Sequence, residues 1–232
     1  MNRASVGGEA VRGVRALGLA PRFVIAGARI AVGAVRHVPG RNMMRETRAT
    51  YFCIDIECSG PVPALYDMIS LGAVVVHADT DGRLCLGDTY YVELRPEGPR
   101  VDAGAMKVNG LDLDRLRAEG RPRREALIDL AEWTRSRTVA GTRPVFVGHN
   151  APFDWSFVAW CYAAEDLPNP YGYKALDTKA LATGKLNLHW FDSSKEVLAE
   201  RLGLPAEDLG LKHRADYDAR YQAELLIKLL EA

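Results

Sequence analysis

Residues 49–57 read Ala-Thr-Tyr-Phe-Cys-Ile-Asp-Ile-Glu, an apolar run of aromatic and β-branched side chains that closes on two acids. This composition predicts a short buried β-strand. The turn sequence Ser-Gly-Pro follows at 59–61, so Asp55 and Glu57 stand at the carboxyl end of the strand, where α/β proteins place their functional sites. Residues two apart on a strand point to the same side of the sheet. Two carboxylates so close together require a bound cation or a raised pKa, although such a pair also occurs by chance on exposed strands.

The segments after this strand predict a mixed sheet with helices on its faces. Residues 68–76 and 89–94 are predicted as two further strands of an antiparallel meander, with the turn sequence Asp-Thr-Asp-Gly at 79–82 between them. The apolar residues of 127–134 then recur at helical spacing, and an apolar strand follows at 145–147. Strands first and helix–strand–helix units afterwards are typical of a mixed α/β architecture.

Two further helix starts are predicted from single residues. Pro152 is a residue favoured in the first turn of a helix, and Phe153, Phe157 and Cys161 continue from it at steps of four. The last helix is expected to begin near Asp216, with that side chain as its N-cap.

Composition limits the class of protein. The chain has 232 residues, of which 48% are hydrophobic and 26% charged, and these proportions exclude a disordered, collagen-like or membrane-embedded class. The length fits one domain with an appendage, which we expect to divide into an extension at 1–47 and a domain at 48–232. The four cysteines show no paired metal-binding spacing, which favours reduced thiols in a cytoplasmic protein.

The first 47 residues differ from the rest in charge. Residues 1–47 carry eight arginines and two glutamates, a net charge of +6, so the rest of this neutral chain carries −6. The apolar stretch at 23–35 contains Arg29 and is shorter than the ~20 apolar residues that cross a bilayer. We expect a disordered extension before a domain that starts near Met43 or Met44; a basic arm that touches nucleic acid and an organelle-targeting segment are the alternatives. A net-negative domain argues against a protein that coats long nucleic acid, because such binding neutralises many phosphates.

Two later segments also place acids at element ends. Residues 148–154 read Gly-His-Asn-Ala-Pro-Phe-Asp, which puts Asp154 in the first turn of a helix, where the helix dipole favours an ionised carboxylate. Residues 213–219 read His-Arg-Ala-Asp-Tyr-Asp-Ala. His213 and Asp218 can converge only if the histidine lies in the loop before the helix and the aspartate in its first turn. Each segment alone would also fit an ordinary helix start.

Taken together, these segments suggest a metal-dependent enzyme. Four carboxylates and one histidine lie on three separate segments, namely Asp55, Glu57, Asp154, His213 and Asp218. Oxygen-only ligands favour Mg²⁺ or Mn²⁺ over zinc. Two such ions, ~3.5–4 Å apart, would clamp the attacking and leaving oxygens of a phosphodiester.

The order Asp-x-Glu, His-Asn-x-x-Phe-Asp and His-x-Ala-x-x-Asp-Ala resembles the three motifs of the DEDDh exonuclease superfamily. That group includes the proofreading subunit of the bacterial replicative polymerase, ribonuclease T and oligoribonuclease. The resemblance covers residues 49–230. It implies a ribonuclease-H-like fold, a five-stranded mixed sheet flanked by helices, and a 3′–5′ exonuclease that releases nucleoside 5′-monophosphates from DNA or RNA.

The resemblance also implies a role for each site residue. Asp55 would contact both metal ions, and Glu57 and Asp218 would complete the tighter site. Asp154 would hold the second ion through water, and His213 would take the proton of the attacking water.

Residues 101–110 resemble the segment of proofreading exonucleases that touches the terminal nucleotide, but Met106 and Asn109 stand where those enzymes often have an aromatic residue and a histidine. The residues expected beside the terminal nucleotide are Cys58, Ser59, Gly60, Met106, Asn109 and Asn150. Turn geometry alone would also account for the residues at 58–60 and for Asn150.

Two other classes of protein stay open at this point. One is a nucleic-acid-binding or polymerase-associated module of the same fold without catalysis. The other is a phosphatase of the haloacid-dehalogenase type, which needs an aspartate where this chain has Glu57. The expected partner is single-stranded or short nucleic acid with a free 3′ end, with no membrane; a polymerase partner or a homodimer is left undetermined.

Overall fold

The computed structural model describes residues 48–232, so the predicted extension at 1–47 lies outside the described residues. The strands are β1 (Ala49–Cys58), β2 (Met68–Ala78), β3 (Leu84–Glu93), β4 (Arg143–Gly148) and β5 (Ala175–Asp177). The helices are α1 (Ala103–Asn109), α2 (Leu113–Glu119), α3 (Arg123–Arg137), α4 (Pro152–Ala164), α5 (Thr178–Lys185), the 3-10 helix η1 (Trp190–Asp192), α6 (Lys195–Leu202) and α7 (Ala215–Glu231). The predicted order, strands first and helices later, is confirmed.

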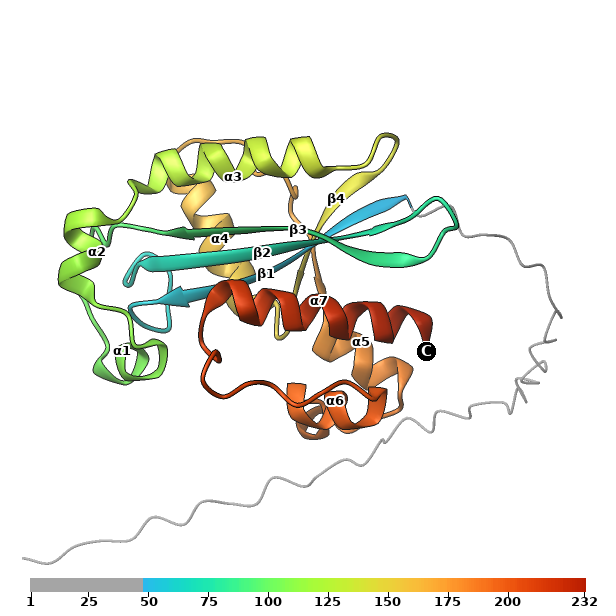
Figure 1. Cartoon of the computed structure of the whole chain (residues 1–232). Helices are drawn as coiled ribbons and strands as arrows, with labels where there is room; N and C mark the ends of the chain where they lie inside the picture. The colour runs from blue at the N-terminus through green and yellow to red at the C-terminus, as the bar shows by residue number, and fades with distance from the viewer. Residues whose placement is uncertain (1–47) are drawn as a thin grey trace, which may run out of the picture. The chain divides into compact units, whose positions relative to one another are not determined.

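The five strands of the described residues form one sheet in the order β3-β2-β1-β4-β5 (Figure 1). The first predicted strand, β1, lies at its centre, antiparallel to β2 and parallel to β4, so the sheet is mixed as predicted. The hairpin between β2 and β3 is closed by Asp79, whose carboxylate accepts from the N–H groups of Asp81 and Arg83. Because β4 and β5 are parallel to β1, the carboxyl ends of all three strands open on the same edge of the sheet.

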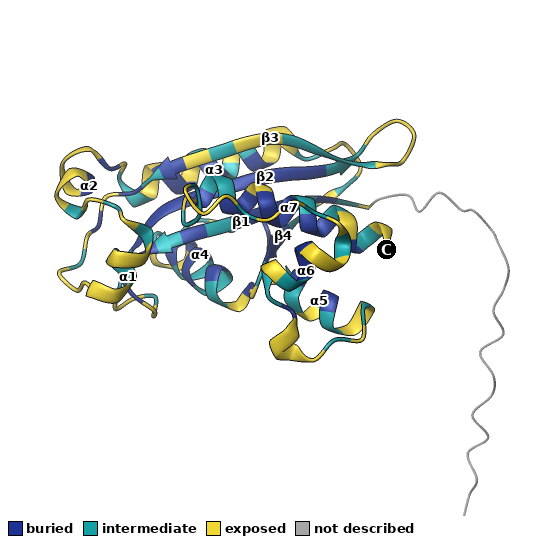
Figure 2. Ribbon diagram, turned by 60° about the horizontal axis from the view of Figure 1, so that its bottom comes forward, coloured by how far each residue is buried: buried dark blue, intermediate teal, exposed yellow. Residues whose placement is uncertain are grey.

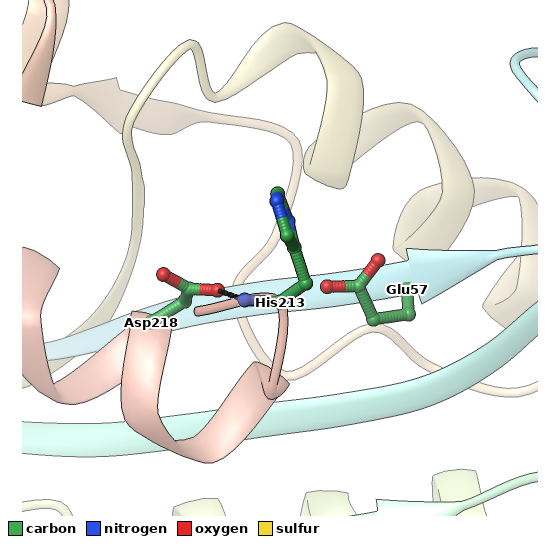
Figure 3. A group of neighbouring side chains, drawn as sticks. All are labelled: Glu57, His213 and Asp218. Atoms are coloured by element: carbon green, nitrogen blue, oxygen red, sulfur yellow. Dashed lines mark hydrogen bonds between the residues drawn. The ribbon is translucent and has the colours of Figure 1, made fainter. Parts of the chain in front are cut away.

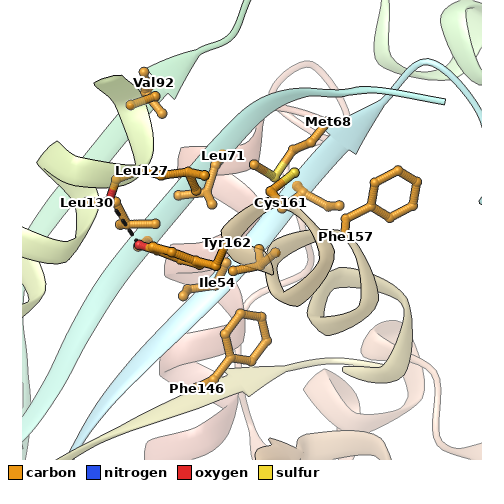
Figure 4. Packing of buried hydrophobic residues seen from close by; sticks show 14 of the residues in the cluster. Ile54, Met68, Leu71, Val92, Leu127, Leu130, Phe146, Phe157, Cys161 and Tyr162 are labelled. Carbon is orange, nitrogen blue, oxygen red and sulfur yellow. Dashed lines mark hydrogen bonds between the residues drawn. The ribbon is translucent and has the colours of Figure 1, made fainter. Parts of the chain in front are cut away.

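Side chains along β1 alternate between two cores. The even-numbered residues 52–56 face α3 and α4 in the larger core, where Tyr162 of α4 donates a hydrogen bond of 3.0 Å to the carbonyl of Leu127 (Figure 4). The odd-numbered residues face the opposite side, where α7 packs. Asp55 and Glu57 therefore both lie on the α7 side of the sheet.

Helix α7 is packed on two sides. Ala219, Ala223 and Leu226 face the sheet, and Leu225 and Leu229 pack against α5 and α6. Figure 2 shows buried residues concentrated along the strands and α7, whereas α1 and α2 are largely exposed. Contacts on both sides fix α7, and hence its first turn, relative to the end of β1.

The short elements were not predicted from the sequence. Helices α1, α2, α5 and α6 each begin after a side chain that accepts a hydrogen bond from the first turn; these N-caps are Asp102, Asp112, Asp177 and Ser194. Among the described residues, no helix combines the length and the apolar character needed to cross a lipid bilayer.

Candidate active site

The candidate site begins at the carboxyl end of β1. Asp55 pairs in register with Gly72 of β2, and the ladder shifts directly after Glu57, where Cys58 pairs with Met68 and Ile69 of β2 is left as the extra residue. Asp55 is largely buried, with 15% of its side chain exposed. The end of β1 therefore presents the carboxylates of Asp55 and Glu57 on the side of the sheet where α7 packs.

Asp154 joins this pair from α4. Pro152 starts the helix, as predicted, and Asp154 lies in its first turn. Its Oδ1 accepts a hydrogen bond of 3.1 Å from the N–H of Ile56, the residue between the two acids of β1. This bond is to the backbone of the strand, so Asp154 itself occupies neither the carboxylate of Asp55 nor that of Glu57.

His213 and Asp218 converge as the sequence required. His213 lies before α7 with a φ of 67°, and its N–H donates to Oδ2 of Asp218 at 2.8 Å. Asp218 is buried in the first turn of α7. The predicted N-cap is wrong: the helix begins at Ala215 after Arg214, which provides no side-chain cap, and Asp216 lies inside the first turn. The left-handed turn at His213 places its N–H against Asp218 instead.

Three of the predicted residues lie close enough to share one ion. One ligand atom each from Glu57, His213 and Asp218 lies within 4.8 Å of the others, and Figure 3 shows the three side chains gathered between the end of β1 and the start of α7. This cluster joins the first and the third acidic segment, and the bond from Ile56 to Asp154 brings the second segment to the same strand.

The electrostatics of the cluster are those of crowded, buried carboxylates. Burial raises the pKa of Asp55 well above its ordinary value; Lys195 opposes this effect, while Asp154, Asp218 and Glu57 add to it. Burial also raises the pKa of Glu57 to about 8 and that of Asp154 to about 7. Acids that resist ionisation in this way form a site that a cation would relieve. The all-oxygen donor set of the four carboxylates fits a hard divalent ion.

Two residues at the site were not predicted. Gln222 is buried and joins two motifs: its Nε2 donates to Oδ1 of Asp55 at 2.5 Å, and its Oε1 accepts from the N–H of His149 at 3.2 Å. Lys195 places its ammonium 3.3 Å from Oδ1 of Asp218 and 3.8 Å from Oδ1 of Asp55. Gln222 lies four residues after Asp218 on one helix, a spacing that could have revealed it. No signal in the sequence marks Lys195.

Two of the residues expected beside the terminal nucleotide, Ser59 and Gly60, lie in the turn directly after β1. The hydroxyl of Ser59 is used inside its own loop, accepting from the N–H of Asp67 at 2.9 Å and donating to the carbonyl of Arg100 at 3.3 Å. Gly60 packs directly against the ring of Tyr66. A Cβ at Gly60 would lie 2.2 Å from a carbon of that ring. These two contacts are explained by turn geometry.

The other four residues of this group lie at the end of β1 (Cys58), in α1 (Met106 and Asn109) and in the turn after β4 (Asn150). Asn109 donates from Nδ2 to the carbonyl of Cys58 at 3.2 Å, which ties α1 to the end of β1. Met106 on the same helix is partly exposed. Asn150 is exposed with a φ of 64°, and its N–H donates to Asp177 at 3.0 Å. Asp177 also caps α5, so its role is structural.

Residues 52–226 match the RNase T family of exonucleases. This chain belongs to that exonuclease family. The RNase T family falls within the DEDDh 3′–5′ exonucleases, so the predicted superfamily and enzyme class are confirmed. The match covers all three acidic motifs and excludes the phosphatase alternative.

Similar proteins include enzymes named for two kinds of nucleic acid. The chain is 34% identical over 182 residues to the 3′–5′ DNA exonuclease Cap18 of Escherichia coli, which covers 78% of this chain and 92% of that protein. It is 30% identical over 177 residues to ribonuclease T of Marinobacter nauticus, which covers 74% and 78% respectively.

Solved structures support the fold. The nuclease domain of 3′hExo, a DEDDh family member bound to rAMP, matches with a TM-score of 0.64 at 15% identity over 79% of this chain and 91% of that one. Exonuclease I of Escherichia coli in complex with a dT13 oligonucleotide matches with a TM-score of 0.59 at 18% identity over 79% and 41%. The predicted ribonuclease-H-like fold is confirmed.

Proposed function

We propose that this exonuclease uses two Mg²⁺ or Mn²⁺ ions to hydrolyse the last phosphodiester bond at the 3′ end of single-stranded or short nucleic acid. One observation supports this most strongly: Glu57, Asp218 and His213 meet within 4.8 Å at the end of the central strand. Burial and mutual repulsion keep Glu57 and Asp55 from ionising easily, which is the electrostatic state that a divalent ion would stabilise.

The four carboxylates would share the ions unequally. Asp55 would contact both, Glu57 and Asp218 would complete one site, and Asp154 would hold the other through water. Bound ions of this kind neutralise charge on the phosphate and stabilise the attacking and leaving oxygens. Gln222 donates to Oδ1 of Asp55 and so fixes the orientation of the carboxylate that would hold the ions.

His213 would act as the general base. Its backbone N–H donates to Asp218, while its ring lies near Glu57 (Figure 3). Water attacks the terminal phosphorus and gives a proton to the imidazole. The bond from phosphorus to the 3′ oxygen of the preceding nucleotide breaks, and that oxygen takes a proton from solvent. The products are a nucleoside 5′-monophosphate and a strand shorter by one residue.

The substrate is proposed to be DNA first and RNA second. The similarity to a DNA exonuclease at 34% identity favours DNA, and the similarity to ribonuclease T at 30% makes RNA the second candidate. The net charge of −6 on residues 48–232 favours short strands, because few phosphates can be neutralised. Met106 and Asn109 of α1, the turn Cys58, Ser59 and Gly60, and Asn150 would surround the terminal nucleotide.

Digestion of end-labelled oligomers tests this proposal. DNA and RNA strands of one sequence, labelled at the 5′ or the 3′ end, are incubated with Mg²⁺ or Mn²⁺. A 3′ label should leave at once as a mononucleotide, whereas a 5′ label should yield a ladder that shortens by single residues. Internal cuts, or release of the 5′ label first, would contradict the proposal. Binding without any hydrolysis would instead favour a catalytically inactive module.

A further inference from the structure

Lys195 lies inside the acidic cluster, although it belongs to none of the three motifs. It is the first residue of α6, directly after the N-cap Ser194. Only 17% of its side chain is exposed, and its Nζ lies 3.3 Å from Asp218 and 3.8 Å from Asp55. A lysine is rarely buried unless its charge is paired, and here the paired groups are two of the proposed metal ligands.

A third carboxylate, that of Glu207, lies near the same ammonium. Glu207 has 3% of its side chain exposed, and neither of its oxygens receives a hydrogen bond within the described residues. Its Oε1 lies 3.9 Å from Nζ of Lys195, and its Oε2 lies 3.3 Å from Nζ of Lys212. A buried carboxylate that receives no hydrogen bond is costly. Glu207 can therefore accept a hydrogen bond from the ammonium of Lys195, which it does not do in this structure.

The two metal ligands can lose Lys195 without losing their orientation. Oδ1 of Asp55 is also held by Gln222, and Oδ2 of Asp218 is held by the N–H of His213. Within residues 48–232, the ammonium of Lys195 is therefore the ion-pair partner that both carboxylates share, and neither carboxylate needs it for its placement. It supplies positive charge at the point where a divalent ion would also be attracted.

We propose that Lys195 is the built-in counter-ion of the metal-free site, and that a divalent ion displaces its ammonium from Asp55 and Asp218 toward Glu207. This inference rests on the proposed metal site. It makes Lys195 a competitor of the ion: it stabilises the site before the ion arrives and lowers the affinity for it.

Manganese binding and thermal unfolding test the competition. In Lys195→Met, Mn²⁺ measured by electron paramagnetic resonance should bind about tenfold more tightly, because a positive charge next to a divalent ion is removed. The same variant in EDTA should melt about 5 °C lower, because the buried acids lose their counter-ion. Lys228→Met is the matched control, since Lys228 is exposed in the last turn of α7, roughly 15 Å along the helix from Asp218. It should change neither quantity.

Glu207→Gln gives the opposite test. Once the carboxylate of Glu207 is replaced, the ammonium of Lys195 should stay on Asp55 and Asp218, so Mn²⁺ binding should weaken about threefold or more. In the double variant with Lys195→Met this weakening should disappear. Weaker or unchanged Mn²⁺ binding by Lys195→Met would overturn the inference, as would a Glu207→Gln effect that persists without the lysine. Failure of the wild-type protein to bind Mn²⁺ would instead overturn the proposed metal site itself.

Discussion

At the scale of single residues, the site is a set of acids held in an environment that disfavours their charge. Glu57 illustrates this: burial first, and the charges of Asp218 and Asp154 second, raise its pKa from 4.5 to about 8. A carboxyl group with a raised pKa in the folded protein keeps a proton that the unfolded chain has lost. Its contribution to stability is therefore fully present below pH ~4.5 and is lost as the pH rises toward 8.

Glu57→Gln should remove this pH dependence. In EDTA, the melting temperature of the variant should exceed that of the wild-type protein by an amount that grows from pH 4.5 to pH 8 and then levels off. Thermal scans across this range measure the difference. Saturating Mg²⁺ provides the control, because a bound ion stabilises the charged carboxylate and should abolish the advantage of the variant. A difference in melting temperature that does not change with pH would show that burial and the neighbouring carboxylates do not raise the pKa of Glu57.

His213 should matter for turnover more than for binding. General-base catalysis contributes typically ~10²–10⁴ in rate, or roughly 3–5 kcal/mol, so His213→Asn should lower kcat by about that factor. Asparagine tolerates the left-handed backbone at this position, which preserves the N–H bond to Asp218. Mn²⁺ affinity should stay within about twofold; a large drop would mean that the imidazole is a metal ligand rather than a base.

At the scale of elements, the site depends on how closely α7 approaches the sheet. Gly72 of β2 pairs with Asp55, and a Cβ at Gly72 would lie 2.1 Å from the carbonyl oxygen of Ala215, the first residue of α7. Real Cβ atoms do not approach backbone atoms so closely, so the start of the helix must move if Gly72 is replaced. That movement carries Asp218 away from Asp55.

Gly72→Ala should therefore lower stability and activity together. We expect a loss of about 1–3 kcal/mol in the free energy of unfolding, the usual cost of overpacking, and a fall in nuclease activity of more than about tenfold. Gly184→Ala in α5 is the control, because no atom other than those of its own helix backbone and chain neighbours lies within 4 Å of the added Cβ. It should be neutral or stabilising by up to about 1 kcal/mol. Chemical denaturation measures the free energy of unfolding, and a nuclease assay measures the activity. Normal activity in Gly72→Ala would contradict the claim that the site depends on the close approach of α7 to the sheet.

How much could be predicted differs between the long and the short elements. The central strand and the two helices that begin at Pro152 and Ala215 were predictable, because apolar periodicity and a proline at a helix start are local signals. Short capped helices such as α6 have too few residues for a periodic pattern. Lys195 could not be predicted, because its place beside Asp55 depends on how α6 packs on α7 and not on local sequence.

At the scale of the whole molecule, the chain has two parts of opposite charge. Residues 1–47 carry +6 and residues 48–232 carry −6. A shortened chain that starts at Met43 should fold with a melting temperature within about 2 °C of the full chain, because the central strand begins only at Ala49. If the basic segment contacts phosphates, its removal should raise KM on long strands and flatten the salt dependence of binding. Short oligomers should be degraded at an unchanged rate; an insoluble shortened protein would contradict the proposed boundary.

The central claim is that the carboxylates at the end of β1 bind divalent ions that carry out the hydrolysis. The most direct measurement is a Mn²⁺ titration of the wild-type protein and Asp55→Asn, in which bound ion and release of a 3′-terminal label are followed in the same samples. The wild-type protein should bind two ions per chain with an oligomer present, and label release should rise with their occupancy. Asp55→Asn should remain folded, lose at least one ion and lose nearly all release. Near wild-type release by Asp55→Asn, or release by the wild-type protein in EDTA, would contradict the account.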